Sequence, residues 1–281
     1  MDYSNCIYLN SDYETLTESQ FHKEKFRLQK ELLKLQEWML EHKKKLVIVF
    51  EGRDAAGKGA AIRRISEHLM TTHFRVVELG IPTSKQNNNW LKTYEKYFPK
   101  EGEIVFFDRS WYSRALIQPT MKYCTKNQYK YFMTNVVDWE KKMVEKGVTI
   151  IKFYLSININ TQVQRFEIRR NHDLKYWKLS TNDIESLDHW EDYTKYKEKM
   201  FKKTSWEGAP WVIMNANNKL IAQLNSIRYV LRTIDYEGKK DLKPRSWTMD
   251  EDNRSLMFLD VQFDNLSEEQ YVLLSRIKQY L

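Results

Sequence analysis

Cysteine is nearly absent from this sequence, and long hydrophobic runs are absent altogether. The chain of 281 residues contains 2 cysteines, Cys6 and Cys124, which are too few for a disulfide framework and lack the spacing of metal ligands. The longest unbroken apolar run is Leu46–Phe50, whereas a membrane-spanning helix needs about 20 residues. Residues 1–14 are partly acidic and have no apolar stretch behind a basic start, which argues against a secretory signal. These absences predict a cytoplasmic protein with no membrane partner.

Several catalytic patterns are missing as well. The 6 histidines form no H-E-x-x-H pair and no G-x-S-x-G elbow occurs, so zinc-protease and serine-hydrolase chemistry have no support. Positive charge, by contrast, is abundant: 46 Lys and Arg stand against 38 Asp and Glu, a formal net charge of +8. This excess favours anionic partners and leaves phosphate esters, nucleic acids and acidic lipids open. With 42% hydrophobic residues, the chain can bury one sizeable core and is neither disordered nor collagen-like.

Hydrophobic periodicity predicts an α/β fold. Residues 21–45 carry apolar side chains three or four positions apart, so we expect a long amphipathic helix with a solvated charged face. Short apolar runs then alternate with helical patterns, and runs that are apolar throughout indicate strands covered on both faces. The predicted strands are Leu46–Glu51, Arg75–Leu79, Ile104–Asp108, Thr149–Leu155 and Pro210–Asn215. Their alternation with helices predicts a mostly parallel sheet with right-handed crossovers.

Changes in composition divide the chain into three parts. We expect an N-terminal extension with its amphipathic helix in residues 1–45, the main domain in 46–235 and a tail in 236–281. Within the main domain, residues from about 161 to 207 are rich in charge, Trp and Tyr, which predicts two or three helices over one edge of the site. The stretch Gly238–Arg245, which contains Pro244, marks the boundary, and the tail ends in a predicted amphipathic helix. We expect this tail to pack on the core or on another subunit.

The strongest motif is a phosphate-binding loop. Residues Gly52–Gly59 read G-R-D-A-A-G-K-G and lie between the strand Leu46–Glu51 and the helical pattern Ala60–Leu69. In that setting, backbone N–H groups wrap a phosphate, the helix N-terminus adds positive potential and Lys58 supplies a charge. The alternative is a glycine-rich turn that happens to contain a lysine. The candidate phosphate-binding residues of the loop are Gly52, Arg53, Ala55, Ala56, Gly57, Lys58 and Gly59.

This loop lacks its usual hydroxyl group. Gly59 takes the place of the Ser or Thr that binds Mg²⁺ in most such loops. Asp54 would repel a bound phosphate unless a divalent cation lay between them, so we predict that it is a Mg²⁺ ligand. Asp108 ends an apolar strand, and the carboxyl ends of parallel strands converge on the ligand crevice, so it is the second predicted ligand. An ordinary helix-capping role is the alternative for either carboxylate.

Basic side chains follow both motifs. Arg109 comes directly after Asp108 and is predicted to neutralise charge on a transferring phosphoryl group. Arg114 is a second candidate, with a structural salt bridge as its alternative. Basic residues are concentrated at the start of the segment 161–207. They predict a lid that closes on phosphate and excludes water, and a solvated charged helix is the alternative. The candidate phosphate-binding residues of the lid are Arg165, Arg169, Arg170 and Lys178.

Taken in order, these motifs resemble the type-2 polyphosphate kinase family. The matching segments are Gly52–Gly59, Phe107–Tyr112, Trp177–Ser180 and Ala209–Trp211, and the resemblance covers about residues 15–235. It implies a P-loop fold like that of thymidylate kinase, a three-layer α/β/α sandwich with a mostly parallel five-stranded sheet and a helical lid. By position, Asp54 and Asp108 match the metal-linked acids of that family. The matching phosphate-contacting residues are Lys58, Arg109, Arg169 and Arg170.

The motifs and the resemblance predict a kinase whose catalytic residues are Asp54, Lys58, Asp108 and Arg109. We expect it to move a phosphoryl group reversibly between inorganic polyphosphate and a nucleoside diphosphate, ADP or GDP, giving the triphosphate. Mg²⁺ is the expected cofactor, with Mn²⁺ as an alternative, and the expected assembly is a homo-oligomer, a dimer or tetramer, without nucleic acid.

Two other functions compete with this prediction. The first is an ATP-dependent nucleoside monophosphate kinase, against which Gly59 and Asp54 speak. The second is a basic protein that binds polyphosphate or RNA without catalysis, and such a protein would not need Asp54 in its phosphate cradle.

Overall fold

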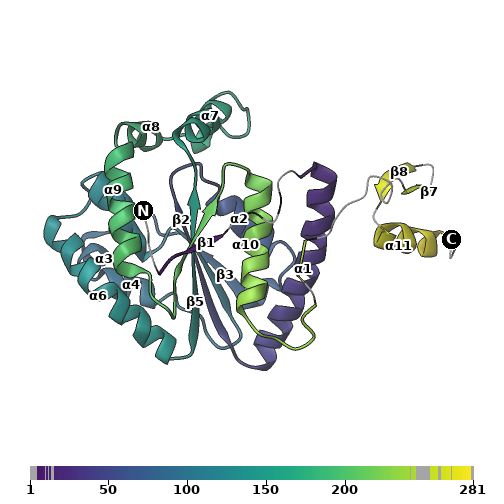
Figure 1. The fold of residues 1–281 in the computed structure, drawn as a ribbon, viewed down its shortest axis with the longest axis horizontal. Helices are drawn as coiled ribbons and strands as arrows, with labels where there is room; N and C mark the ends of the chain where they lie inside the picture. The colour runs from purple at the N-terminus through teal and green to yellow at the C-terminus, as the bar shows by residue number, and fades with distance from the viewer. Residues whose placement is uncertain are drawn as a thin grey trace.

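Parallel strands form the centre of the molecule. The computed structural model describes residues 5–9, 11, 13, 16–240, 242–244, 254–258, 261–266 and 268–279. Six strands form one sheet in the order β1-β6-β5-β2-β4-β3, and every neighbouring pair is parallel (Figure 1). From β1 to β6 they span Ile7–Leu9, Lys45–Gly52, Phe74–Val77, Ile104–Asp108, Val148–Ser156 and Trp211–Asn215. All five predicted strands and their parallel arrangement are confirmed.

The sheet has one strand more than predicted. β1 lies at the edge of the sheet beside β6, with Ile7 opposite Val212 and Leu9 opposite Met214. A strand of three residues is too short to show a period of two in its side chains. Backbone pairing with β6 defines it, and that pairing cannot be read from a local pattern.

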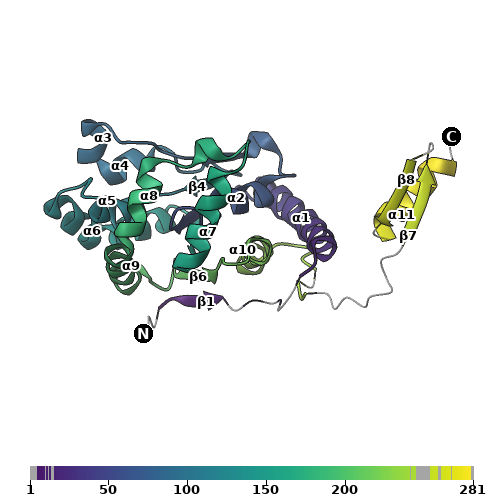
Figure 2. The same ribbon diagram turned by 90° about the horizontal axis from the view of Figure 1, so that it is seen from above.

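Helices cover both faces of the sheet because its strands are apolar on both. Along β2, Leu46, Ile48 and Phe50 enter one core, and Val47 and Val49 enter the other. The first core is covered by α1 (Glu18–Glu41), α2 (Lys58–Ser66) and α10 (Lys219–Thr233), and the second by α4 (Trp90–Glu95), α6 (Lys126–Glu145) and α9 (Trp190–Thr204) (Figures 1 and 2). Shorter helical segments are η1 (Thr71–His73), α3 (Ser84–Asn88), η2 (Trp111–Arg114) and α5 (Ile117–Thr120). The predicted three-layer α/β/α architecture is confirmed.

The long N-terminal helix begins earlier and ends earlier than its predicted range. The Thr17 side chain accepts a hydrogen bond from the Gln20 backbone N–H at 3.2 Å, and the Gln20 side chain accepts one from the Thr17 N–H at 3.0 Å. This reciprocal capping box starts α1 at Glu18. Leu28 and Leu35 are fully buried on the face that packs against α10. The apolar stripe of α1 therefore serves the core.

Residues between β5 and β6 form the predicted helices. They are α7 (Ile159–Arg170), η3 (Tyr176–Lys178), α8 (Thr181–Asp188) and α9. Figure 1 shows α7 and α8 above the end of the sheet, whereas α9 runs back along one face. Met200 and Phe201 of α9 are buried in the second core, so α9 belongs to the helical layer on that face. Of these residues, only the segment from α7 to α8 lies beyond the end of the sheet (Figure 1).

The C-terminal elements form a small unit of their own. β7 (Arg254–Phe258) and β8 (Val261–Leu266) make an antiparallel hairpin, and α11 (Glu268–Gln279) packs on it. Figures 1 and 2 show this unit beyond α1 and apart from the six-stranded sheet. The predicted closing helix is confirmed, the hairpin was not predicted, and packing of residues 236–281 on the core or on another subunit stays a prediction. Among the helices that the structure describes, none has the length and apolar character needed to cross a membrane.

Candidate active site

The predicted phosphate-binding loop connects β2 to α2. Gly52 and Gly57 have φ of 146° and 110°, and a Cβ at Gly52 would lie 2.5 Å from the Leu155 carbonyl oxygen, so the loop needs glycine there. Lys58 Nζ donates hydrogen bonds to the Gly52 and Arg53 carbonyl oxygens at 2.9 and 3.1 Å. Burial lowers the pKa of Lys58, and the neighbouring Arg109 lowers it further. The loop therefore has the predicted context of strand, glycine-rich turn and helix N-terminus.

The structure shows which group lies where the usual hydroxyl would be. A Cβ at Gly59 would lie 2.9 Å from Oδ2 of Asp108. Asp108 reaches this position because it ends β4, where it pairs with Phe50 of β2. Its carboxylate therefore occupies the space into which a Ser or Thr side chain would extend. A carboxylate oxygen therefore lies beside the loop, and it comes from the neighbouring strand.

Asp54 and Arg109 form an ion pair at the mouth of the site. A terminal guanidinium nitrogen of Arg109 donates to Asp54 Oδ1, with 35% and 12% of the two side chains exposed. Asp54 is the main cause that raises the pKa of Arg109 above its ordinary value. The sequence predicted both residues for the site, and the structure brings them into contact.

Arg165 holds the phosphate-binding loop through its backbone. The guanidinium donates to the carbonyl oxygens of Ala55 and Ala56 at 2.9 and 3.1 Å, and to those of Ala216 and Asn217 at 2.7 and 3.0 Å. Burial, followed by repulsion from a neighbouring arginine, lowers its pKa to about 10. Arg165 was predicted to bind phosphate, but its described hydrogen bonds all go to carbonyl oxygens. In this structure Arg165 connects the loop to the two residues that follow β6.

Arg53 and Arg114, which were also predicted to bind phosphate, contact aromatic rings and oxygen atoms of the chain, and their contact with phosphate stays a prediction. The Arg53 guanidinium stacks on Trp190 at 3.4 Å and donates to Thr194 Oγ1 at 2.6 Å, so it ties the loop to α9. Arg114 is fully buried, donates to the Asn87 carbonyl oxygen at 3.1 Å and lies over the Trp90 ring at 4.5 Å. These arginines were predicted from charge and position alone, and the aromatic rings and carbonyl groups that engage them come from distant parts of the chain.

The remaining lid cations lie near the surface. Arg169 donates to the Lys178 carbonyl oxygen at 3.3 Å and lies 3.9 Å from an Asp183 oxygen. Arg170 pairs with Glu167 at 2.6 Å, with about half of each side chain exposed. The Lys178 amine lies over an aromatic ring of its own turn. These side chains belong to α7 and η3, above the loop, and their predicted contact with phosphate stays a prediction.

One basic residue beside the loop was not predicted from the sequence. Lys219 begins α10, and a Cβ at Gly57 would lie 3.9 Å from its Cγ. Burial, together with repulsion from Arg165, Arg169 and Lys175, lowers the pKa of Lys219 to about 8. The lysine follows the last predicted strand within a run of asparagines, so a search of strand ends for cations would have found it. It adds to a group of positive charges on the α7 side of the loop.

A buried carboxyl group was also missed. Glu51 is 2% exposed, and its Oε1 accepts hydrogen bonds from the Ser110 N–H and the Ser110 hydroxyl, both at 2.8 Å. Burial raises the pKa of Glu51 to about 7, against the opposing effect of Lys58. A single acidic residue within an apolar strand is the signal that could have revealed it.

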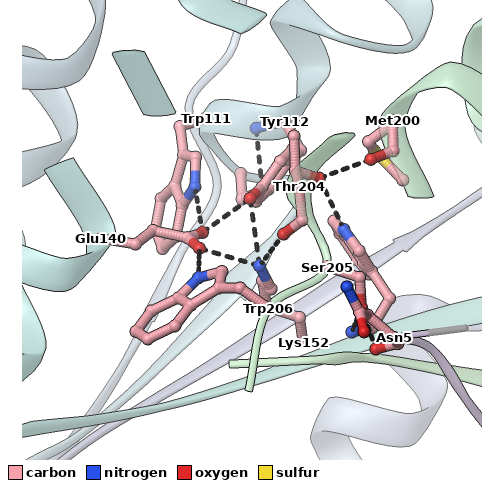
Figure 3. Close-up of polar contacts among 11 residues, drawn as sticks. Asn5, Trp111, Tyr112, Glu140, Lys152, Met200, Thr204, Ser205 and Trp206 are labelled. Atoms are coloured by element: carbon pink, nitrogen blue, oxygen red, sulfur yellow. Dashed lines mark hydrogen bonds and ion pairs between the residues drawn. The ribbon is translucent and has the colours of Figure 1, made fainter. Parts of the chain in front are cut away.

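A buried ion pair anchors the segment that follows Asp108 (Figure 3). Lys152 on β5 and Glu140 on α6 are fully buried, with Nζ and Oε2 2.8 Å apart. Lys152 also donates to the Tyr112 hydroxyl at 3.1 Å and to the Thr204 carbonyl oxygen at 2.9 Å. Glu140 accepts further hydrogen bonds from Trp111, Tyr112 and Trp206 at 3.1, 2.8 and 2.9 Å. With these partners, the buried charges are compensated, and η2 is tied to the end of α9.

This geometry defines a class of protein. A phosphate-binding loop after β2, an arginine after β4 that pairs with Asp54 of that loop, and helices over both are the parts of a P-loop phosphotransferase. The fold resembles that of a crystal structure titled Polyphosphate Kinase 2 from Arthrobacter aurescens, with a TM-score of 0.74, 24% identity and coverage of 86% of this chain and 88% of that one. At this identity, the likeness concerns the fold.

Sequence comparisons identify the family. The family model described as Polyphosphate kinase 2 matches residues 15–242, so the chain belongs to the polyphosphate kinase 2 family, as predicted, and is a phosphoryl-transferring kinase. It is 43% identical over 227 residues to a GDP-polyphosphate phosphotransferase of Mycolicibacterium smegmatis, covering 80% of each protein. It is 46% identical over 220 residues to NDP-polyphosphate phosphotransferase 2 of Ruegeria pomeroyi, covering 78% of this chain and 64% of that protein.

Proposed function

We propose that this protein transfers the terminal phosphoryl group of inorganic polyphosphate to a nucleoside diphosphate, ADP or GDP, and that it also catalyses the reverse reaction with Mg²⁺. The observation that carries this proposal is the Asp108 carboxylate packed against Gly59, beside the Asp54–Arg109 pair. Two carboxylates beside a phosphate-binding loop could bind a divalent cation, and that cation could in turn bind the oxygens of polyphosphate. The names of the two relatives, which specify GDP and nucleoside diphosphates as acceptors, support the choice of acceptor.

The side chains at the loop suit a magnesium ion. Asp54 and Asp108 offer carboxylate oxygens, and Mg²⁺ prefers oxygen ligands, keeping several waters and taking one or two carboxylates together with phosphate oxygens. Within the described residues, no group of three or more His, Cys, Asp or Glu side chains could hold a metal by itself. Waters and phosphate oxygens would complete the coordination of an ion held by these two carboxylates. Mg²⁺ bound there supplies charge neutralisation on the phosphates, and Mn²⁺ offers the same chemistry.

The chain's own residues supply positioning and positive charge. Backbone N–H groups between Gly52 and Lys58 would hold the transferred group, with Lys58 beside it. Arg109 would neutralise negative charge that develops as the phosphoryl group leaves its donor. The terminal oxygen of a nucleoside diphosphate is already anionic at neutral pH, so the reaction needs no strong general base. In-line positioning and charge neutralisation are the demands that remain.

The donor chain would leave the loop on its α7 side. Lys219, Arg169 and Lys175 lie close enough to one another to depress the pKa of Lys219. Within the described part of the chain, neither Lys219 nor Lys175 has a carboxylate within ion-pair distance. A polyanion running past Gly57 would relieve this mutual repulsion. The same surface gives a neutral nucleobase no comparable gain, which favours polyphosphate over ATP as the donor.

A donor and acceptor matrix tests the proposal. The protein is incubated with Mg²⁺ and either polyphosphate or ATP, and with ADP, GDP, AMP and a pyrimidine diphosphate in separate reactions, and the nucleotide products are separated. We expect triphosphate from polyphosphate and a purine diphosphate. Transfer from ATP to AMP without use of polyphosphate would identify a monophosphate kinase instead. Polyphosphate binding without any turnover would identify a binding protein.

Compartment and assembly complete the proposal. We propose a cytoplasmic protein, which is supported by the free thiols of Cys6 and Cys124. We also propose a homo-oligomer, a dimer or tetramer, because Val272, Leu273 and Ile277 expose apolar side chains along α11. Light scattering on the eluting protein measures the mass, and a monomer at micromolar concentration would contradict the second proposal.

A further inference from the structure

Arg109 sits in a backbone conformation that its side chain disfavours. Its φ is 63°, in the left-handed region, where a Cβ crowds the backbone. Arg109 follows the last residue of β4 and is separated from η2 by one residue, and its guanidinium pairs with Asp54. Such a conformation persists only where the surroundings hold it.

Both peptide groups that flank Arg109 are fastened to β2. The Arg109 N–H donates to the Phe50 carbonyl oxygen at 3.1 Å, which orients the peptide before the residue. The next N–H, that of Ser110, donates to Glu51 Oε1 at 2.8 Å, which orients the peptide after it. Together these two bonds restrict φ and ψ of Arg109, and they come from neighbouring residues of one strand. The first is a backbone bond that any residue could make, whereas the second depends on the Glu51 side chain.

The Ser110 hydroxyl strengthens this attachment. It donates to the same Glu51 oxygen at 2.8 Å and accepts from the Tyr112 N–H at 3.1 Å, where it caps η2. Glu51 is buried, so water does not compete for these donors. Glu51 therefore links β2 to the turn and to the first residues of η2.

We propose that Glu51 is a positioning residue that holds the Arg109 turn in its left-handed conformation and thereby sets the guanidinium beside Asp54. This inference rests on the proposed catalytic role of Arg109. It assigns Glu51 neither a bound metal nor a proton transfer. What the turn requires is a hydrogen-bond acceptor at Oε1, so the amide oxygen of glutamine should serve almost as well as a carboxylate.

A double-mutant cycle tests this inference. Glu51→Ala should lower kcat by roughly 10- to 100-fold, because small displacements of a positioned group cost that much, while Glu51→Gln should restore most of kcat. In an Arg109→Ala background, Glu51→Ala should lower kcat by less than about threefold, since the group that it positions is gone. Ser110→Ala, which keeps the backbone N–H, should give a smaller loss of the same kind. This variant carries the test if Glu51→Ala fails to fold.

Glu24→Ala is the matched control. Glu24 is equally buried, but it lies on α1, where it accepts hydrogen bonds from Tyr13 and Arg27 at 2.9 and 2.8 Å. Its loss should lower the melting temperature, and its effect on kcat should be the same with or without Arg109. If the Glu51 and Arg109 effects on kcat also multiply independently, the positioning inference is wrong. If Arg109→Ala leaves kcat unchanged, it is the proposed role of Arg109 that fails.

Discussion

Replacing Gly59 with alanine should separate stability from activity. Gly59 is the second residue of α2, and alanine is more favourable than glycine within a helix by about 0.5–1 kcal/mol. The new Cβ, however, would lie 2.9 Å from Asp108 Oδ2, whereas ordinary contacts begin at 3.4 Å. The carboxylate is the far end of a side chain and can retreat by about 0.5 Å. We therefore expect an unchanged or higher melting temperature and, because a displacement of about 1 Å can cost 100-fold, a loss of roughly tenfold or more in turnover.

The assay measures initial rates at several Mg²⁺ concentrations with polyphosphate and ADP saturating. If Asp108 binds the ion, Gly59→Ala should raise the Mg²⁺ concentration for half-maximal rate, and Gly59→Ser should do the same although it restores the usual hydroxyl. Gly80→Ala is the matched control, because a Cβ at Gly80 has nothing within 4 Å. In an Asp108→Asn background, Gly59→Ala should have little further effect.

Three results for Gly59→Ala would contradict different parts of this prediction. Wild-type activity of Gly59→Ala at limiting Mg²⁺ would refute the claim that the position of Asp108 matters. A large fall in melting temperature would show that the carboxylate cannot retreat. Equal losses in the presence and absence of the Asp108 side chain would place the effect elsewhere in the loop.

Other perturbations address the remaining parts of the site. Asp54→Asn and Asp108→Asn should each remove most activity with the fold intact, and near-normal turnover at saturating Mg²⁺ would remove that residue from the metal site. Arg109→Ala should lower kcat and kcat/KM together by roughly two to four powers of ten, with partial recovery in Arg109→Lys, and a change confined to the donor KM would make it a binding residue. Burial raises the pKa of Glu51 to about 7, so its contribution to stability is full below the ordinary value of 4.5 and is lost as pH rises through 7. Without ligands, wild type should thus lose up to about 3 kcal/mol relative to Glu51→Gln between pH 5 and 8 in denaturant titrations, and a constant difference would contradict this. Lys219→Ala should raise the KM for polyphosphate with a smaller change in kcat. Equal KM values for polyphosphate in 50 and 200 mM salt would argue against a basic surface that binds the donor chain.

The sequence was most informative where local chemistry dictates structure. The glycine-rich loop, the strand before it and Asp108 at the end of an apolar run could all be predicted, because backbone conformation and strand burial leave direct patterns in composition. The contact between Asp108 and Gly59 could not be predicted. It depends on the register of β2 against β4, a relation between segments some 50 residues apart. The missing hydroxyl was visible in the sequence, while the carboxylate beside it was visible only in three dimensions.

The arginines show what the sequence could not predict. Charge and position suggested phosphate contacts for Arg53, Arg114 and Arg165 alike. Burial among aromatic rings and carbonyl oxygens removed all three from the open surface. A guanidinium group has five donors in a plane, so it serves equally well to fasten loops through backbone oxygens. Sequence alone does not distinguish these uses, because the carbonyl groups that would reveal the structural use are present in every residue.

These internal arginines change the meaning of the net charge of +8. An arginine whose terminal nitrogens donate to carbonyl oxygens still adds to the field of the site, and Arg165 does so by helping to lower the pKa of Lys219. Its four described hydrogen bonds leave one of its five N–H donors, that of Nε, for any other partner. In the function that we propose, the positive charge of Arg165, Arg169, Lys175 and Lys219 beside the loop would attract a polyanion without binding each phosphate. Short-range contacts would then be made by the backbone N–H groups, Lys58 and Arg109. Such a division suits a donor that is a repeating chain, because a diffuse field lets the chain advance after each transfer, while the fixed contacts select the terminal group.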